Sequence, residues 1–101
     1  MSSSTPEGKF KSKFCSQLRK MGCTAVIQYT QGVGTAKGFP DTIVLLPEGL
    51  TVYIEFKAHK NAKFQPLQKE WIKKLNERNF FAWVCYPENA DEIMGEIRRL
   101  L

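Results

Sequence analysis

The sequence predicts an α/β fold in which a four-stranded sheet carries helices before, between and after its strands. Apolar residues recur at helical spacing in three segments: near each end of the chain and over residues 66–79. Between these segments lie short stretches rich in β-branched and aromatic residues, as strands are. The run 43–46 is apolar without a break, which is typical of a strand covered on both faces. The expected order is α-β-β-β-α-β-α.

The first helix is expected to begin at Thr5-Pro6-Glu7, where a capping hydroxyl, a proline and an acid follow one another. Its buried stripe is formed by Phe10, Phe14, Leu18 and Met21. Gly22 ends the helix as a C-terminal glycine does. Residues 1–5 are polar and are expected to be flexible. Residues 6–101 show no linker and no repeat, so a single domain is expected.

Three strands are expected next, over residues 24–30, 41–46 and 50–58. The glycine-rich segment 31–40 is a predicted loop, and Pro47-Glu48-Gly49 is a predicted turn. In the third strand the side chains alternate between two faces. One face would carry Thr51, Tyr53, Glu55 and Lys57, and the other Val52, Ile54, Phe56 and Ala58.

The second half of the chain continues with a basic loop, a helix, a strand and a last helix. The loop covers residues 59–65, and the helix begins at Pro66 and ends near Asn79. Its inward stripe is expected to be Leu67, Trp71, Ile72 and Leu75. A strand follows over residues 80–86, and Asn89 is expected to cap the last helix. That helix would have acids in its first turn and arginines in its last. Its inward-facing residues are expected to be Ile93, Met94, Ile97 and Leu101.

Composition sets limits on the class of protein. The 101 residues are 43% hydrophobic, which is enough for one core. No apolar run approaches the roughly 20 residues that cross a bilayer, and no signal peptide is visible, so we expect a soluble cytoplasmic protein without a membrane partner. The three scattered cysteines and single histidine argue against a structural zinc site and suggest free thiols, with Cys85 in the core. Aromatic residues are abundant for this size, and we expect most of Trp71, Phe80, Phe81 and Trp83 in the core, with any exposed part forming a dimer surface.

Charge gives a weaker indication of the partner. The net charge is +5, and the first 40 residues are strongly basic. Such a distribution suggests a polyanion such as nucleic acid, although a solvated lysine-rich surface would look the same.

The residues that suggest chemistry lie on the two expected strands 41–46 and 50–58. If Gly49 is left-handed in a three-residue loop, Leu46 pairs with Leu50, and Asp41 then lies opposite Glu55 with Cβ atoms roughly 5 Å apart. Facing carboxylates repel each other, and a divalent cation such as Mg²⁺ would offset the repulsion. Lys57, on the same face, could orient a water or neutralise charge on a phosphate. A simpler interpretation stays open, in which Asp41 caps a turn while Glu55 and Lys57 form an exposed charge ladder.

Pro40-Asp41 followed by Glu55-Phe56-Lys57 resembles the PD-(D/E)XK nuclease signature. The expected order matches that superfamily's restriction-endonuclease-like αβββαβ core, with an additional C-terminal helix. Over residues 7–86, the run 38–41, the run 54–57 and Gln68 together resemble the VRR-NUC (virus-type replication-repair nuclease) family, in particular its small stand-alone, phage-type members.

The resemblance implies a metal site and a set of catalytic residues. Asp41, Glu55 and the backbone carbonyl of Phe56 would bind Mg²⁺, for which Mn²⁺ would substitute. Lys57 would be catalytic and Gln68 an active-site helper, with Gln65 as the competing glutamine. Glu7 would match an acidic residue that many relatives place beside the metal. The family also implies a homodimer that acts on branched DNA, such as a Holliday junction.

Basic residues near these positions are candidates for holding the DNA backbone, a role that carries no sequence information. They are Lys37, Lys60 and Lys63 in the loops, and Lys9 and Lys13 in the basic first half. His59 lies near Lys57 but stays outside the catalytic set. Three alternatives remain open: a nicking or flap nuclease of the same fold, a non-catalytic DNA-binding module, and, remotely, a small α/β regulatory protein.

Overall fold

The computed structural model describes residues 5–27 and 37–101. Its main elements are α1 (Pro6–Lys20), β1 (Thr24–Ile27), β2 (Thr42–Leu45), β3 (Thr51–Phe56), α2 (Pro66–Glu77), β4 (Phe81–Cys85) and α3 (Ala90–Leu100). Short 3-10 turns, η2 (Pro47–Gly49) and η3 (Pro87–Asn89), precede β3 and α3. The predicted order is confirmed. The expected strand residues 28–30 and loop residues 31–36 lie outside the described part.

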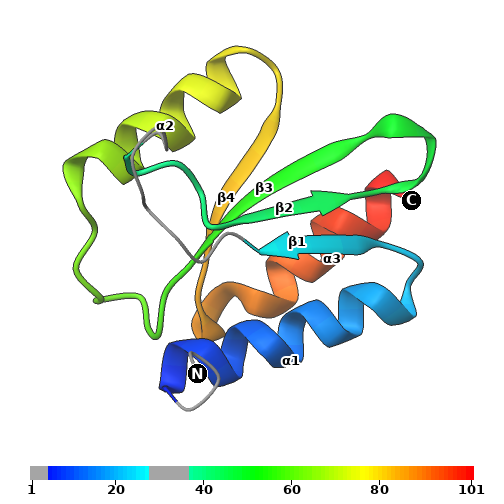
Figure 1. The fold of residues 1–101 in the computed structure, drawn as a ribbon, viewed down its shortest axis with the longest axis horizontal. Coiled ribbons are helices and arrows are strands. Elements are labelled where there is room, and N and C mark those ends of the chain that lie inside the picture. Colours follow the sequence, from blue (N-terminus) through cyan, green and yellow to red (C-terminus); the bar gives the residue numbers. More distant parts are fainter. Residues whose placement is uncertain (1–4, 28–36) are drawn as a thin grey trace.

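The four strands form one sheet in the order β1-β2-β3-β4. The first three strands are antiparallel, and β4 runs parallel to β3. Figure 1 shows α1 and α3 on one face of the sheet and α2 on the other, against β4. Consecutive residues of β2 show that α2 does not cover β1 and β2. Val44, on the face covered by α1 and α3, is fully buried, whereas Leu45, on the opposite face, is 44% exposed. The expectation that strand 41–46 is covered on both faces is therefore only half right.

The β2–β3 hairpin has the register that a three-residue loop requires. Thr42 pairs with Ile54 and Leu45 with Thr51, and the Leu46 N–H donates to the Leu50 carbonyl at 2.8 Å. Gly49 is left-handed, with φ 82°, as expected. Glu48 is left-handed too, with φ 65°, which was not predicted and costs about 1–2 kcal/mol for a residue with a Cβ. One step beyond the ladder, Asp41 stands opposite Glu55.

An aromatic cluster fixes the end of β3 beneath α1. The Phe56 ring is fully buried and lies 5.7 Å from the Phe10 ring and 5.4 Å from the Phe14 ring, both edge-on. Burial of a side chain this size stabilises the fold by about 1.5–3 kcal/mol, and edge-on rings add to it. Because Phe56 stands between Glu55 and Lys57, this packing holds both neighbours in place.

A second cluster attaches residues 37–40 to α2. The Phe39 ring lies 5.0 Å from the Trp71 ring and 5.8 Å from the Tyr53 ring. The indole Nε1 of Trp71 donates to the Lys37 carbonyl at 3.0 Å. The segment that leads into Asp41 is thus held by both the sheet and α2.

The helix ends agree with the sequence in part. Thr5 Oγ1 accepts from the Gly8 N–H at 2.9 Å, and Gly22 is left-handed with φ 90°, so both predicted ends of α1 are confirmed. Asn89 stands at the start of α3, but its side chain accepts from the Tyr86 N–H and donates to the Val84 carbonyl, and makes no capping bond. The turn η3 satisfies that side chain before α3 begins.

Several expected core residues are not buried. Leu67 is 46% exposed and Leu101 is 52% exposed, because each lies at a helix end beyond the covering neighbours. The aromatic residues are also less buried than expected: Phe80 and Phe81 are exposed, while Trp71 and Trp83 are half-buried. Strand β3 ends at Phe56 rather than Ala58, although the Lys57 N–H still donates to the Cys85 carbonyl at 2.9 Å.

The three cysteines are free thiols, and all of them are buried, as expected for Cys85. Burial raises the pKa of Cys85 to about 12. Within residues 5–27 and 37–101, no helix has the length and apolar character needed to cross a membrane.

Gly38 gives a test of the contact between residues 37–40 and α2. It has φ 80°, and an added Cβ would lie 2.6 Å from the Leu67 Cβ and 2.9 Å from the Gln68 nitrogen. We expect Gly38→Ala to lower the free energy of unfolding by about 3 kcal/mol or more, from left-handed strain plus the clash. Gly22→Ala is the matched control: it is also left-handed, but nothing lies within 4 Å, so only about 1–2 kcal/mol should be lost. If urea denaturation showed the same loss of unfolding free energy for Gly38→Ala and Gly22→Ala, the close contact between Gly38 and α2 would be contradicted.

Candidate active site

Asp41 and Glu55 are brought together by the hairpin register. Asp41 immediately precedes β2 and Glu55 is the penultimate residue of β3, and the Asp41 N–H donates to Glu55 Oε1 at 3.2 Å. Their side chains are only 16% and 8% exposed, respectively. The two carboxylates therefore lie together on one face, as the register predicted, and Glu55 is buried rather than part of an exposed charge ladder.

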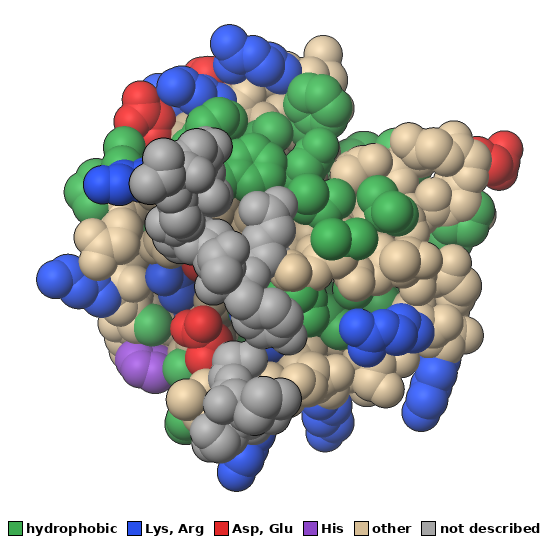
Figure 2. Space-filling model, viewed as in Figure 1, with side chains coloured by type: hydrophobic (Ala, Val, Ile, Leu, Met, Phe, Trp, Pro, Cys, Tyr) green, Lys and Arg blue, Asp and Glu red, His purple; other side chains and the backbone are tan. Residues whose placement is uncertain are grey.

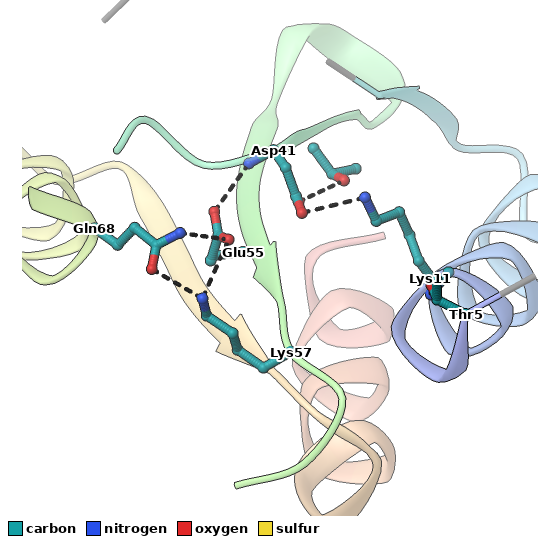
Figure 3. Close-up of polar contacts among 8 residues, drawn as sticks. Thr5, Lys11, Asp41, Glu55, Lys57 and Gln68 are labelled. Atoms are coloured by element: carbon teal, nitrogen blue, oxygen red, sulfur yellow. Dashed lines mark hydrogen bonds and ion pairs between the residues drawn. The ribbon is translucent and has the colours of Figure 1, made fainter. Parts of the chain in front are cut away.

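Gln68 joins Lys57 to Glu55, as Figure 3 shows. Lys57 Nζ donates to Gln68 Oε1 at 2.9 Å, and Gln68 Nε2 donates to Glu55 Oε2 at 3.0 Å. The direct ion pair between Lys57 and Glu55 is longer, at 3.8 Å. The amide thus presents its oxygen to the ammonium and its nitrogen to the carboxylate, and so fixes both side chains.

The start of α2 decides between the two candidate glutamines. Gln65 is the N-cap residue, and its backbone carbonyl accepts from the backbone N–H of Gln68 at 3.0 Å. Gln68 Oε1 accepts from the Gln65 N–H at 3.0 Å while also accepting from Lys57. The bond from the Gln65 N–H and the bond to Glu55 orient the Gln68 side chain toward the acids, while Gln65 stands at the helix start.

Lys11 completes the charge arrangement from the other side. Its Nζ lies 3.2 Å from Asp41 Oδ2, and the Lys11 side chain is 11% exposed. Figure 3 shows it reaching from α1 toward Asp41, on the side opposite Lys57. The sequence alone assigned no role to Lys11. The available signal was its position four residues before buried Cys15 and seven before buried Leu18, which places a lysine on the apolar face of α1.

Burial controls the electrostatics of both acids. Burial raises the pKa of Asp41, and Lys11 and the hydroxyl of Thr42 oppose that rise. Burial first, and then the charge of Asp41, raise the pKa of Glu55 to about 7, while Lys57 opposes the rise. A carboxyl group with a pKa near neutrality, next to a second carboxylate, is typical of a functional site.

An open pocket of about 450 Å³ gives access to these groups. It is lined by Lys37, Gly38, Phe39, Asp41, Glu55, Gln65, Pro66, Leu67 and Gln68. Glu7 is half-buried in the first turn of α1, and its charge makes a small contribution to raising the pKa of Glu55. Among the described residues no three acidic, histidine or cysteine side chains converge as a metal site, so Glu7 does not join Asp41 and Glu55 at close range.

The predicted DNA-contacting lysines fall in different places. Lys37 lines the Asp41–Glu55 pocket. Lys60 lines a second pocket of about 520 Å³ that also contains Lys57 and Lys69, whereas Lys63 is exposed in the same loop. Lys13 lines a separate groove between α1 and α3.

Two further lysines, Lys9 and Lys69, lie on α1 and α2 respectively. Lys9 is exposed on α1. Lys69 was missed by the sequence reasoning, and its Nζ lies 5.7 Å from the centre of the Phe64 ring. Its signal was its place directly after Gln68 on a helix that reaches the site.

Comparison with known proteins agrees with the fold. The VRR-NUC domain model matches residues 3–89. A solved structure titled VRR_NUC domain superposes with a TM-score of 0.77 at 23% identity, covering 90% of this chain and 96% of that one. A second, titled VRR_NUC domain protein, has a TM-score of 0.65 at 19% identity, covering 94% and 87%. No curated protein matches the sequence. The fold is that of a nuclease domain, and the chain belongs to the VRR-NUC family.

The raised pKa of Glu55 predicts how stability depends on pH. The folded protein keeps this proton up to pH about 7, whereas an unfolded chain releases it near 4.5, so the unfolded state binds fewer protons between these values. Stability should therefore fall as pH rises through that window, by about 3 kcal/mol from this group. In chelator, we expect Glu55→Gln to remove this loss in urea denaturation between pH 4.5 and 7.5. The exposed Glu77→Gln should keep the wild-type slope, and parallel curves for wild type and Glu55→Gln would contradict the assignment.

Proposed function

We propose that this protein is a Mg²⁺-dependent endodeoxyribonuclease that hydrolyses phosphodiester bonds in branched DNA. The observation that carries the proposal is the arrangement of Asp41, Glu55 and Lys57, with Gln68 linking the last two beside an open pocket. Family membership supports the nuclease part of this proposal. The metal and the catalytic roles are inferred from the residues themselves, and the branched substrate is carried over from the resemblance to the family.

The donor set fits a divalent cation that prefers oxygen. Asp41 and Glu55 supply two carboxylates at one side of the pocket, and burial makes their mutual repulsion costly. We propose the Phe56 carbonyl as a third oxygen, because the buried Phe56 ring fixes this peptide next to Glu55. Mg²⁺ takes oxygen ligands and keeps several waters, and Mn²⁺ would substitute for it. When bound, such an ion polarises a phosphate oxygen and lowers the pKa of a bound water.

The chain's own side chains would position the reacting groups. Lys57 can hold an attacking water or donate to a phosphate oxygen on which negative charge develops. Gln68 keeps the Lys57 ammonium beside Glu55, at 2.9 Å from the amide oxygen, instead of letting it extend into solvent. The reaction would be a single displacement by water, and no side chain here is required as a covalent nucleophile.

Cations on both sides of the site suggest a path for the DNA backbone. Lys37 lines the Asp41–Glu55 pocket, and Lys60 and Lys69 line the second pocket together with Lys57, whose ammonium lies 3.8 Å from Glu55. The second pocket has no acidic residue among its described lining, so it attracts phosphate. We propose that the strand passes from one pocket to the other across Lys57.

Substitutions that keep size but remove charge test the catalytic roles. Asp41→Asn and Glu55→Gln should abolish cleavage while DNA binds as well as or better than to wild type, because a negative charge is lost. Lys57→Met should slow cleavage by about 10²–10³-fold. The matched control is Lys73→Met, which removes an exposed positive charge from α2. Gel assays of cleavage and fluorescence anisotropy of binding provide the two measurements. Full cleavage in Asp41→Asn, or in excess chelator, would rule out the proposed mechanism.

An exposed apolar surface on β1 and β2 supports a homodimer. Val26 is 43% exposed and Leu45 is 44% exposed, and both lie on the sheet face that α2 leaves open beside half-buried Ile43. Hydrophobic side chains gather on the face of the molecule seen in Figure 2. A two-fold dimer through this surface would present two identical sites to the paired strands of a junction.

Disruption of this surface provides a test of the branched substrate. Wild type should cut a four-way junction faster than a flap, and a flap faster than a plain duplex. Leu45→Lys should sediment as a monomer, and its paired cuts in the junction should become single cuts. Equal cleavage of all three DNAs by wild type would indicate a nuclease without preference for branched DNA. Paired cutting by a monomeric Leu45→Lys variant would contradict the role of the dimer.

A further inference from the structure

Lys11 is a buried cation whose position none of the family motifs explains. It comes from α1, far from the hairpin in sequence, and its Nζ is 3.2 Å from Asp41 Oδ2. Asp41 Oδ1 accepts from the Thr42 hydroxyl at 3.0 Å. Both oxygens of the expected metal-binding carboxylate are therefore already engaged within the protein.

Charge explains why a lysine is useful at this place. Two nearly buried carboxylates, Asp41 and Glu55, would destabilise the fold if nothing offset them. Lys57 lies beside Glu55, and Lys11 lies beside Asp41 on the other side of the pair. Each acid thus has an ammonium partner within ion-pair distance.

We propose that Lys11 is a positioning residue that takes the place of the divalent cation at Asp41 and is displaced when the metal binds. The inference rests on the proposed function, because it assumes that Asp41 is a ligand. The Thr42 hydroxyl is neutral and can stay on Oδ1 beside a metal. The Lys11 ammonium has the same sign of charge as the metal and contacts the other oxygen, so it competes with the metal directly. Lys11 therefore stabilises the metal-free protein and weakens its affinity for metal.

Lys11→Met separates this role from a purely structural one. In calorimetric titration with Mn²⁺, the dissociation constant of the variant should be lower than that of wild type by about tenfold or more. The reason is that an ammonium at ion-pair distance from a carboxylate has been removed. In chelator, the variant should melt at a lower temperature than wild type, because Asp41 is left buried without its partner. In saturating Mn²⁺ that difference should shrink, since the metal then supplies the charge that the lysine supplied. A structural lysine would lower the melting temperature by the same amount in both conditions, with unchanged or weaker affinity.

Two further variants keep the experiment decisive. Lys11→Gln retains a hydrogen-bond donor for Asp41 while losing the charge, so it should fold even if Lys11→Met does not, and should also bind Mn²⁺ more tightly. Lys20→Met removes an exposed charge from the same helix and should leave the dissociation constant within about twofold of wild type, since exposed charges are screened. If wild type binds no Mn²⁺, the proposed function fails. If wild type binds Mn²⁺ and neither Lys11 variant binds it more tightly, only the role of Lys11 is overturned.

Discussion

The pairing of β2 with β3 is the constraint on which the rest of this structure depends. Side chains alternate along a strand, so a slip of one residue would send Glu55 to the α1 face and turn Phe56 toward α2. Two independent features prevent the slip. The turn at Glu48 and Gly49 closes the hairpin at one length, and the Phe56 ring fits between Phe10 and Phe14 only in this register. Core packing and the polar site are thus held by the same strand, on opposite faces.

The polar face shows how a small domain accommodates two buried acids. Their cost is shared among elements that are distant in sequence: Lys11 comes from α1, Lys57 follows β3, and Gln68 comes from the first turn of α2. Each makes a bond that would be lost if its element moved away. The acids, which would be a liability in isolation, therefore become a reason for α1, α2 and the hairpin to stay together, and metal binding would act on that same set of bonds.

The sequence was most informative where the relevant physics is local. Local residues predicted the start of each of these elements. Thr5 marks the cap of α1, Pro66 the start of α2, and Gly49 the length of the hairpin turn. The register then placed Asp41 against Glu55 without any knowledge of the tertiary fold. The position of Gln68 followed from family resemblance, and the hydrogen bond from the Gln65 N–H to its side chain could be recognised only once the helix start was known.

What the sequence could not give depends on how elements pack against one another. Helical periodicity indicates which face of a helix points inward, but not how far its neighbours extend, which is why Leu67 and Leu101 were misplaced. The ion pair of Lys11 with Asp41 requires the position of α1 on the sheet, which no local pattern encodes. The second left-handed residue, Glu48, is a detail of the turn that Gly49 alone does not determine.

The thiols have a practical consequence for work on this protein. Cys15, Cys23 and Cys85 are all buried, and burial raises the pKa of each. Because the thiolate is the reactive form, alkylating labels and oxidants should leave them largely untouched at neutral pH. A cysteine introduced on the surface would then be the preferred site of labelling. Fluorophores or spin probes could be attached beside either pocket without first removing the native cysteines from a core that packs around them.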